Sequence, residues 1–227
     1  MAWREWVRGV EIEPSIYAAD FTRLGEQLTA VMDAGARIFQ FDVGDGHFVE
    51  PVTIGPIVLE SIAPLVHERG GVLDCHLMVD SPERHFPQIA RAGGDSVTFH
   101  LEATADPAAT AARAREHGLA VGLAFKPGTA VGDAVAAAAE AGVELVLCMT
   151  IHPGYSGQEF LPESYERIRR LRELLPEHVY VQVDGGVNGH NLARVRESGA
   201  QLIVTGSAVF GAEDVGRAYA DLVRAVS

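Results

Sequence analysis

The sequence contains little cysteine, and what it has points to a reducing compartment. Its 227 residues include two cysteines, Cys75 and Cys148, and each falls in a separate apolar run that predicts a buried strand. Cysteine is among the residue types most often buried, so we expect two reduced core thiols and no disulfide framework. This expectation suits a reducing cytosol.

Positive charge is also scarce. The chain has 18 Lys and Arg residues against 31 Asp and Glu residues, a formal net charge of -13 at pH 7. Nucleic-acid affinity rests mostly on Lys and Arg side chains that neutralise phosphates, so we expect no nucleic-acid partner. A small phosphorylated ligand remains compatible with this charge, because backbone N–H groups and helix N-termini attract anions locally.

Long apolar runs are missing as well. The opening segment MAWREWVRGVEIEP lacks the uninterrupted apolar stretch of a signal peptide. No later segment reaches the roughly 20 apolar residues that a membrane span requires. We therefore expect a cytoplasmic protein with no membrane partner.

What the sequence does contain is a regular alternation of short apolar runs and longer amphipathic segments. The apolar runs predict eight strands, over 10–18, 37–43, 71–79, 95–101, 119–125, 143–151, 178–185 and 201–206. The amphipathic segments predict helices over 21–35, 81–93, 109–118, 133–142, 163–177 and 188–199. Alternation at a spacing of roughly 25 to 30 residues predicts a parallel sheet, and eight such units can close into a barrel.

The length favours one domain. A chain of 227 residues suits one complete α/β barrel and is short for two ordinary domains. The competing architecture is an open doubly wound sheet, which would usually have fewer strands at this length. We expect the α/β class, with a single (β/α)8 TIM-barrel domain over residues 1–227.

Polar residues stand where the predicted strands end. Catalytic residues of such barrels belong at the carboxyl ends of the strands, where side chains of different strands converge. Side chains alternate along a strand, so each polar set below should point into the barrel from one strand. The sets are Gln40, Asp42 and Gly44 in the second strand, Asp74, His76 and Met78 in the third, and Gln182 and Asp184 in the seventh; Ser15 follows the first strand, and Asp45 also ends the second.

Two carboxylates on separate strands, with an imidazole between them, suit inversion at a carbon next to a carbonyl. One group removes a proton from one face, and the other returns a proton to the opposite face. A divalent metal could stabilise the enediolate that forms, and carboxylates with imidazole are reasonable ligands for Zn²⁺, Mn²⁺ or Fe²⁺. A lone Asp at a strand end is more often a helix cap or turn former, so the hypothesis depends on the set as a whole.

Three glycine-rich segments follow the last three predicted strands. They are HPGYSGQ at 152–158, DGGV at 184–187 and TGSAVF at 205–210. Barrels of this type often hold a phosphate at this place, through bare backbone N–H groups and a short extra helix. We expect that helix within residues 207–212.

The chain resembles the ribulose-phosphate 3-epimerase family through segments that occur in the family's order between residues 14 and 210. They are EPSIYAADFTRLGEQL, FDVGDGHFV, TIGP, LDCHLMVDSPE, FKPGT, HPGYSGQEF, VDGGV and TGSAVF. The resemblance implies a (β/α)8 barrel that interconverts D-ribulose 5-phosphate and D-xylulose 5-phosphate. It also implies a homo-oligomer, because the family forms dimers and larger assemblies.

Residue by residue, the resemblance makes Asp42 and Asp184 the acid–base pair and also ligands of one divalent metal ion. His76 matches a further metal ligand that also lies at the substrate, and Ser15 matches a serine that contacts the substrate. Met78 and Met149 match methionines that cap the enediolate region. The residues that match the phosphate-gripping loops are Gly154, Gly157, Gly185, Gly186, Gly206 and Ser207.

Three departures from the family fall in the same site. Gln40 replaces a histidine metal ligand, Gly44 replaces a methionine, and Glu50-Pro51 replaces the usual Pro-Asn. If Gln40 is a ligand, its neutral amide oxygen should hold a transition metal more weakly than imidazole does. His152 has two interpretations: a replacement imidazole near the metal, or an ordinary exposed loop histidine.

Two alternatives to the leading function stay open. Loss of the methionine side chain at Gly44 would widen the mouth, so the same chemistry could act on a hexulose 6-phosphate or a specialised pentulose. The substitution at Gln40 would also suit a barrel that binds a sugar phosphate without turning it over. Against that second alternative, both carboxylates, His76 and the glycine-rich loops are all present.

Overall fold

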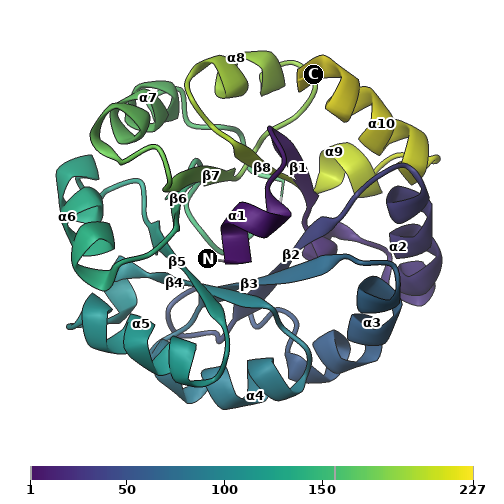
Figure 1. Ribbon diagram of the computed structural model, residues 1–227. Helices are drawn as coiled ribbons and strands as arrows, with labels where there is room; N and C mark the ends of the chain where they lie inside the picture. Colours follow the sequence, from purple (N-terminus) through teal and green to yellow (C-terminus); the bar gives the residue numbers. More distant parts are fainter. Residues whose placement is uncertain (1, 156, 227) are drawn as a thin grey trace.

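Eight parallel strands form the inner ring of the computed structural model, which describes residues 2–155 and 157–226 (Figure 1). The strands are β1 (Glu11–Pro14), β2 (Ile38–Gly44), β3 (Val72–Met78), β4 (Ser96–His100), β5 (Ala120–Phe125), β6 (Leu145–Met149), β7 (Tyr180–Asp184) and β8 (Leu202–Thr205). Their order is β1-β8-β7-β6-β5-β4-β3-β2. The regular ladder leaves one seam, between β1 and β2, where a parallel bridge pairs Ser15 with Gln40. The fold is therefore a nearly closed (β/α)8 barrel, as the sequence predicts.

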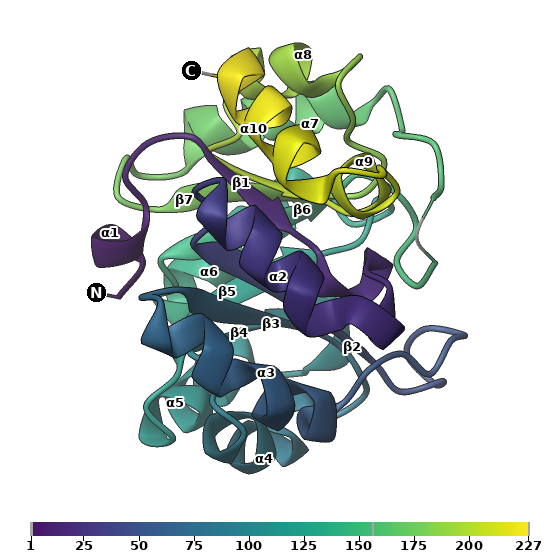
Figure 2. The same cartoon turned by 90° about the vertical axis from the view of Figure 1, so that its right-hand side faces the viewer.

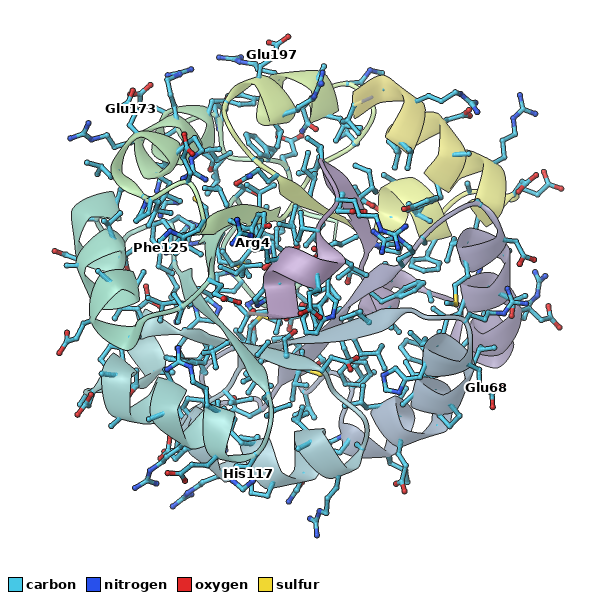
Figure 3. The ribbon with its side chains drawn as sticks, viewed as in Figure 1. Arg4, Glu68, His117, Phe125, Glu173 and Glu197 are labelled. Atoms are coloured by element: carbon cyan, nitrogen blue, oxygen red, sulfur yellow. The ribbon has the colours of Figure 1, made fainter. Side chains whose placement is uncertain are left out.

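Helices surround this ring. They are α1 (Ala2–Trp6), α2 (Leu24–Asp33), α3 (Pro56–Glu68), α4 (Phe86–Arg91), α5 (Pro107–Glu116), α6 (Val131–Ala141), α7 (Ser164–Leu174), α8 (Leu192–Glu197), α9 (Ser207–Phe210) and α10 (Val215–Val226), with 3-10 helices η1 (Ile16–Ala18), η2 (Phe21–Arg23), η3 (Pro82–Arg84) and η4 (Leu101–Ala103). In α7, Tyr165, Ile168 and Leu171 recur every three residues and form one buried stripe against the strands. The opposite faces carry charge: Figure 3 shows Glu68, Glu173 and Glu197 on the outside of the ring.

Helix α1 closes the amino-terminal end of the barrel. Trp3 is fully buried and belongs to one apolar cluster with Ile38, Val72, Leu145 and Leu202, each the first residue of its strand. Figure 2 shows α1 at one end of the barrel and the loops that follow β2 and β6 at the other. Helix α1 covers this end, and the cavity described below opens at the other end, which we call the mouth.

The predicted elements agree with the structure in type and order, with one correction. Each of the eight apolar runs overlaps a strand and each amphipathic segment overlaps a helix, and α9 lies within 207–212. The run over 10–18 is wrong at its end, because the ladder stops at Pro14 and Ile16–Ala18 form η1. Ile16 is still buried, so its apolar character reflects core packing and not strand pairing. Helices α1, α3 and α10 were not among the predicted elements.

Two further expectations can be compared with the structure. Cys75 and Cys148 are free and buried, in β3 and β6, which confirms the prediction of two reduced core thiols. Within 2–155 and 157–226, no helix is both long enough and apolar enough to cross a membrane.

Polar side chains fill the middle of the barrel. Gln182 donates from Nε2 to Glu13 Oε2 at 2.6 Å and to Asp74 Oδ2 at 2.9 Å. Ser96 and Thr98 donate to the other oxygen of Asp74 at 2.7 and 3.2 Å. Burial, and then the nearby Asp74, raise the pKa of Glu13 well above its usual value, which favours the protonated form of this acid. This hydrogen-bonded layer lies beneath the residues of the mouth.

Candidate active site

A cavity of about 540 Å³ opens at the mouth of the barrel. Many of the residues singled out in the sequence line it, namely Ser15, Asp42, Met78, Met149, Gly154, Gly157, Asp184, Gly185, Gly186, Gly206 and Ser207. Gln40 and His76 are fully buried and contact Asp42 and Asp184 in the cavity wall. The structure thus brings the whole predicted set together at one place.

Strand register brings the charged groups together. Asp42 on β2 pairs with His76 on β3, and Met149 on β6 pairs with Asp184 on β7. His76 Nδ1 lies 2.9 Å from Asp42 Oδ1 and 3.5 Å from Asp184 Oδ2. Ser15 donates its hydroxyl to Asp42 Oδ2 at 2.6 Å. Two carboxylates from strands on different sides of the barrel therefore face one another next to one imidazole.

This cluster fits a metal ion. One ligand atom each from Asp42, His76 and Asp184 lies within 4.8 Å of the other two, and the donor set of two carboxylates and one imidazole suits a divalent transition metal. Gln40 Nε2 lies 2.8 Å from Asp42 Oδ1, 2.9 Å from Asp184 Oδ2 and 3.5 Å from His76 Nδ1. The amide is thus close enough to join the cluster as a fourth group.

The protonation of the two carboxylates differs. Burial, and then the charge of Asp42, raise the pKa of Asp184 to about 7. Burial also opposes ionisation of Asp42, but the hydrogen bond and positive charge of His76 outweigh it, so the pKa of Asp42 lies below its usual value. For His76, burial is outweighed by the same carboxylates, which raise its pKa. One carboxylate is therefore set up as a base and the other can carry a proton at neutral pH, as two-sided proton transfer requires.

His100 contacts the ring of His76 on the side away from Asp42, and the sequence analysis did not single it out. Its Nε2 lies 2.9 Å from His76 Nε2, and its Nδ1 lies 3.3 Å from Glu102 Oε2. Burial lowers the pKa of His100 to about 4, so this ring is neutral and its Nε2 can accept a hydrogen bond from the ring of His76. The alternation along β4 could have found it, because Ser96, Thr98 and His100 share the inward face.

The glycine-rich loops line one side of the cavity. Gly186 has a φ of +68°, and a Cβ placed there would lie 2.5 Å from the backbone nitrogen of Phe160, so this turn needs glycine. Gly206 and Ser207 precede and begin α9. Among the described residues that line the cavity, Arg194 is the only one with a basic side chain, and its guanidinium lies 3.8 Å from the centre of the Tyr165 ring. Sequence analysis did not single out Arg194, because it lies in α8 beyond the loop motif.

Gly44 does not widen the mouth, contrary to the expectation from the sequence. A Cβ at this position would lie 3.0 Å from the carbonyl oxygen of Pro51, 3.0 Å from Val49 and 3.1 Å from Thr53. Thr53 also accepts a hydrogen bond from Gly44 N at 2.6 Å and donates one to Asp42 O at 2.7 Å. The loop after β2 has folded down over the glycine, so the space that a larger side chain would need is filled.

The other departures lie at the edge of the cavity. Pro51 packs on Gly154 of the loop after β6, since a Cβ on that glycine would lie 3.3 Å from the proline ring. His152 is exposed, and the cluster of possible metal ligands found among the described residues does not include it. The interpretation of His152 as an ordinary loop histidine therefore agrees with the structure.

The fold and this cluster suit a class of (β/α)8-barrel enzymes that move a proton on a small substrate. The sequence model of the ribulose-phosphate 3 epimerase family matches residues 11–210. The chain belongs to this family, whose members are isomerases that act on sugar phosphates.

Relatives match over almost the whole chain. Ribulose-phosphate 3-epimerase 1 of Cupriavidus necator is 37% identical over 223 residues, which cover 95% of this chain and 90% of that protein. The ribulose-phosphate 3-epimerase of Synechocystis is 39% identical over 218 residues, 94% of this chain and 93% of that protein. The Bacillus subtilis enzyme of the same name is 36% identical over 217 residues, 94% of this chain and 98% of that protein.

Solved structures with lower identity share the barrel. A 3-hexulose-6-phosphate synthase superposes with a TM-score of 0.71 at 19% identity, covering 96% of this chain and 100% of that one. Orotidine 5'-phosphate decarboxylase from Pyrococcus horikoshii superposes with a TM-score of 0.69 at 18% identity, covering 95% and 98%. At these identities the likeness concerns the fold alone.

Proposed function

We propose that the protein inverts C3 of a ketose phosphate and interconverts D-ribulose 5-phosphate and D-xylulose 5-phosphate. The observation that carries the proposal is the pair Asp42 and Asp184, on β2 and β7, which face one cavity with pKa values shifted in opposite directions. The family supports the same reaction, because relatives at 36% to 39% identity are named ribulose-phosphate 3-epimerase.

In the proposed reaction, one carboxylate removes the C3 proton from one face of the sugar. The other carboxyl group returns a proton to the opposite face, which inverts the configuration. Ser15 holds Asp42 through its hydroxyl group, so that carboxylate keeps one orientation toward the substrate. Met78 and Met149 line the cavity and are almost fully buried, which supports a role in excluding water from the carbanion.

We further propose that Asp42, His76 and Asp184 hold one divalent cation, Zn²⁺, Mn²⁺ or Fe²⁺. When bound, it would supply positive charge to stabilise the enediolate oxygens. The backbone N–H groups of the loops at Gly154, Gly186 and Gly206 are proposed to bind the phosphate, since they line the same cavity. A homo-oligomer is proposed because members of the family form dimers and larger assemblies. A cytoplasmic location is proposed from the two free, buried thiols.

The test is an epimerase assay with a panel of ketose phosphates, before and after metal removal by a chelator. We expect the highest specificity constant for D-ribulose 5-phosphate, loss of activity in the chelated protein, and recovery on adding one of the three metals. A preference for a hexulose 6-phosphate or another pentulose would replace the substrate assignment. Binding of every sugar without turnover would support the non-catalytic alternative.

Arg194 yields a prediction about phosphate binding. Because it is the one basic side chain among the described lining residues, Arg194→Gln should raise KM for the phosphorylated substrate by about tenfold and leave kcat nearly unchanged. Steady-state kinetics at low and high salt would measure this, and the difference from wild type should shrink as salt screens the charge. Arg196→Gln is the matched control, since Arg196 is exposed on the same helix and does not line the cavity. Equal effects of both variants would contradict a specific role.

A further inference from the structure

The side-chain amide of Gln40 occupies the centre of the proposed metal cluster. Its Nε2 donates to Asp42 Oδ1 at 2.8 Å and to Asp184 Oδ2 at 2.9 Å, so the two N–H bonds of one amide join the two catalytic carboxyl groups. The same nitrogen lies 3.5 Å from His76 Nδ1. These neighbouring acids are thus held together by a neutral donor.

The other end of the same amide has no partner. Gln40 is fully buried, and Gln40 Oε1 is a buried acceptor without a hydrogen bond. Such an orphaned acceptor carries a desolvation cost that selection usually removes. Rotation of the amide by half a turn about its Cγ–Cδ bond exchanges the positions of Nε2 and Oε1, so the oxygen can face the two carboxyl groups only if a cation or a carboxyl proton lies between them.

We propose that Gln40 has two working orientations: in the metal-free protein its NH2 group bridges Asp42 and Asp184, and in the metal-loaded protein it turns so that Oε1 becomes a ligand. An amide N–H cannot ligate a cation, whereas an amide oxygen can. The bridge keeps the acids assembled before the ion arrives, and the turn gives the buried oxygen its missing partner. The inference rests on the metal site of the proposed function and adds a role that histidine at this position could not fill.

Two consequences separate this proposal from simpler ones. Metal binding must break two amide hydrogen bonds, so the ion should be held less tightly than by a chain with imidazole at position 40. If the amide only competed with the ion and never turned, removing it would strengthen metal binding. If it turns and ligates, removing it weakens metal binding, so the direction of the change decides.

The chain offers a matched control in Gln182. This glutamine also bridges two carboxyl groups through Nε2, those of Glu13 and Asp74, and also has a buried oxygen without a partner. It belongs to the layer beneath the site, and the cluster of possible ligands identified in the described part of the chain does not contain Glu13 or Asp74. Replacing Gln182 therefore removes a similar bridge without touching the metal site.

The experiment measures Zn²⁺ affinity by chelator competition and melting of the metal-free protein by calorimetry, in wild type, Gln40→Leu, Gln40→His and Gln182→Leu. Gln40→Leu should bind Zn²⁺ roughly tenfold more weakly than wild type, and Gln40→His roughly tenfold more tightly. Gln40→Leu and Gln182→Leu should both melt roughly 5 °C lower in the metal-free state, because each removes the amide donor that two buried carboxyl groups share. Gln182→Leu should keep its Zn²⁺ affinity.

Tighter Zn²⁺ binding by Gln40→Leu, or no Zn²⁺ binding by wild type, would contradict the proposal that the Gln40 amide turns and ligates the ion. An unchanged melting temperature of metal-free Gln40→Leu would contradict the proposal that Gln40 bridges Asp42 and Asp184. If the leucine variant does not fold, Gln40→His alone decides, since equal or weaker Zn²⁺ binding by that variant also overturns the proposal. Neither measurement needs turnover, so an inactive wild-type protein with the expected affinities would refute the proposed reaction and leave the role of Gln40 standing.

Discussion

Asp184→Asn should lower the rate of epimerisation by about 10³-fold, because it removes one of the two groups proposed to exchange a proton with C3. The asparagine can keep the geometry, since its side-chain oxygen can still accept the hydrogen bond that Gln40 donates to Asp184 Oδ2 at 2.9 Å. Proton exchange should be affected on one side only. The epimer whose C3 proton faces residue 184 should stop exchanging with deuterated solvent, while the other epimer still loses its proton to Asp42.

Deuterium incorporation followed by NMR for each epimer separately would measure this asymmetry. Asp133→Asn is the control, because Asp133 is an exposed acid on α6 outside the cavity. Exchange that persists from both epimers at the wild-type rate would remove Asp184 from the reaction.

Asp42→Asn should cause a loss of epimerisation of similar size, about 10³-fold, with the opposite pattern of exchange. The Ser15 hydroxyl can rotate to accept from the new amide, so the position can still be held. The variant also removes a negative charge 2.9 Å from His76, so we expect weaker metal binding in addition.

The two aspartate variants together test the arrangement of the site. Each should retain exchange from the epimer that the other has lost. If both variants lose exchange from the same epimer, the two carboxyl groups act on one face and the two-sided mechanism is wrong. Circular dichroism and cavity binding of inorganic phosphate would verify that both variants remain folded.

Much of the fold could be predicted because the information is local. Each apolar run needs only its own length and its flanking helix to indicate a buried parallel strand. Alternation along the strands also places Asp42, His76 and Asp184 inward, and a barrel leaves inward side chains one common space. The exception at Ile16–Ala18 has a similar cause: an apolar run records burial, and burial continues past the point where the strand ladder ends.

The details of the site could not be predicted in this way. The orientation of Gln40 depends on carboxylates from β2 and β7 together. The effect of Gly44 depends on a loop that returns to cover it, through Val49, Pro51 and Thr53. In the sequence a glycine in place of a larger residue indicates empty space, but in the structure the backbone of a neighbouring loop takes that space.

The seam between β1 and β2 has a consequence for the stability of the working protein. These strands close the circle, and the bridge recorded between them in the described chain pairs Ser15 with Gln40, both of which also hold Asp42. A cation or sugar bound there clamps together the two edges of the sheet. A bound ligand should therefore raise the free energy needed to open the barrel, by an amount that grows with ligand concentration. The protein without ligand should unfold more easily.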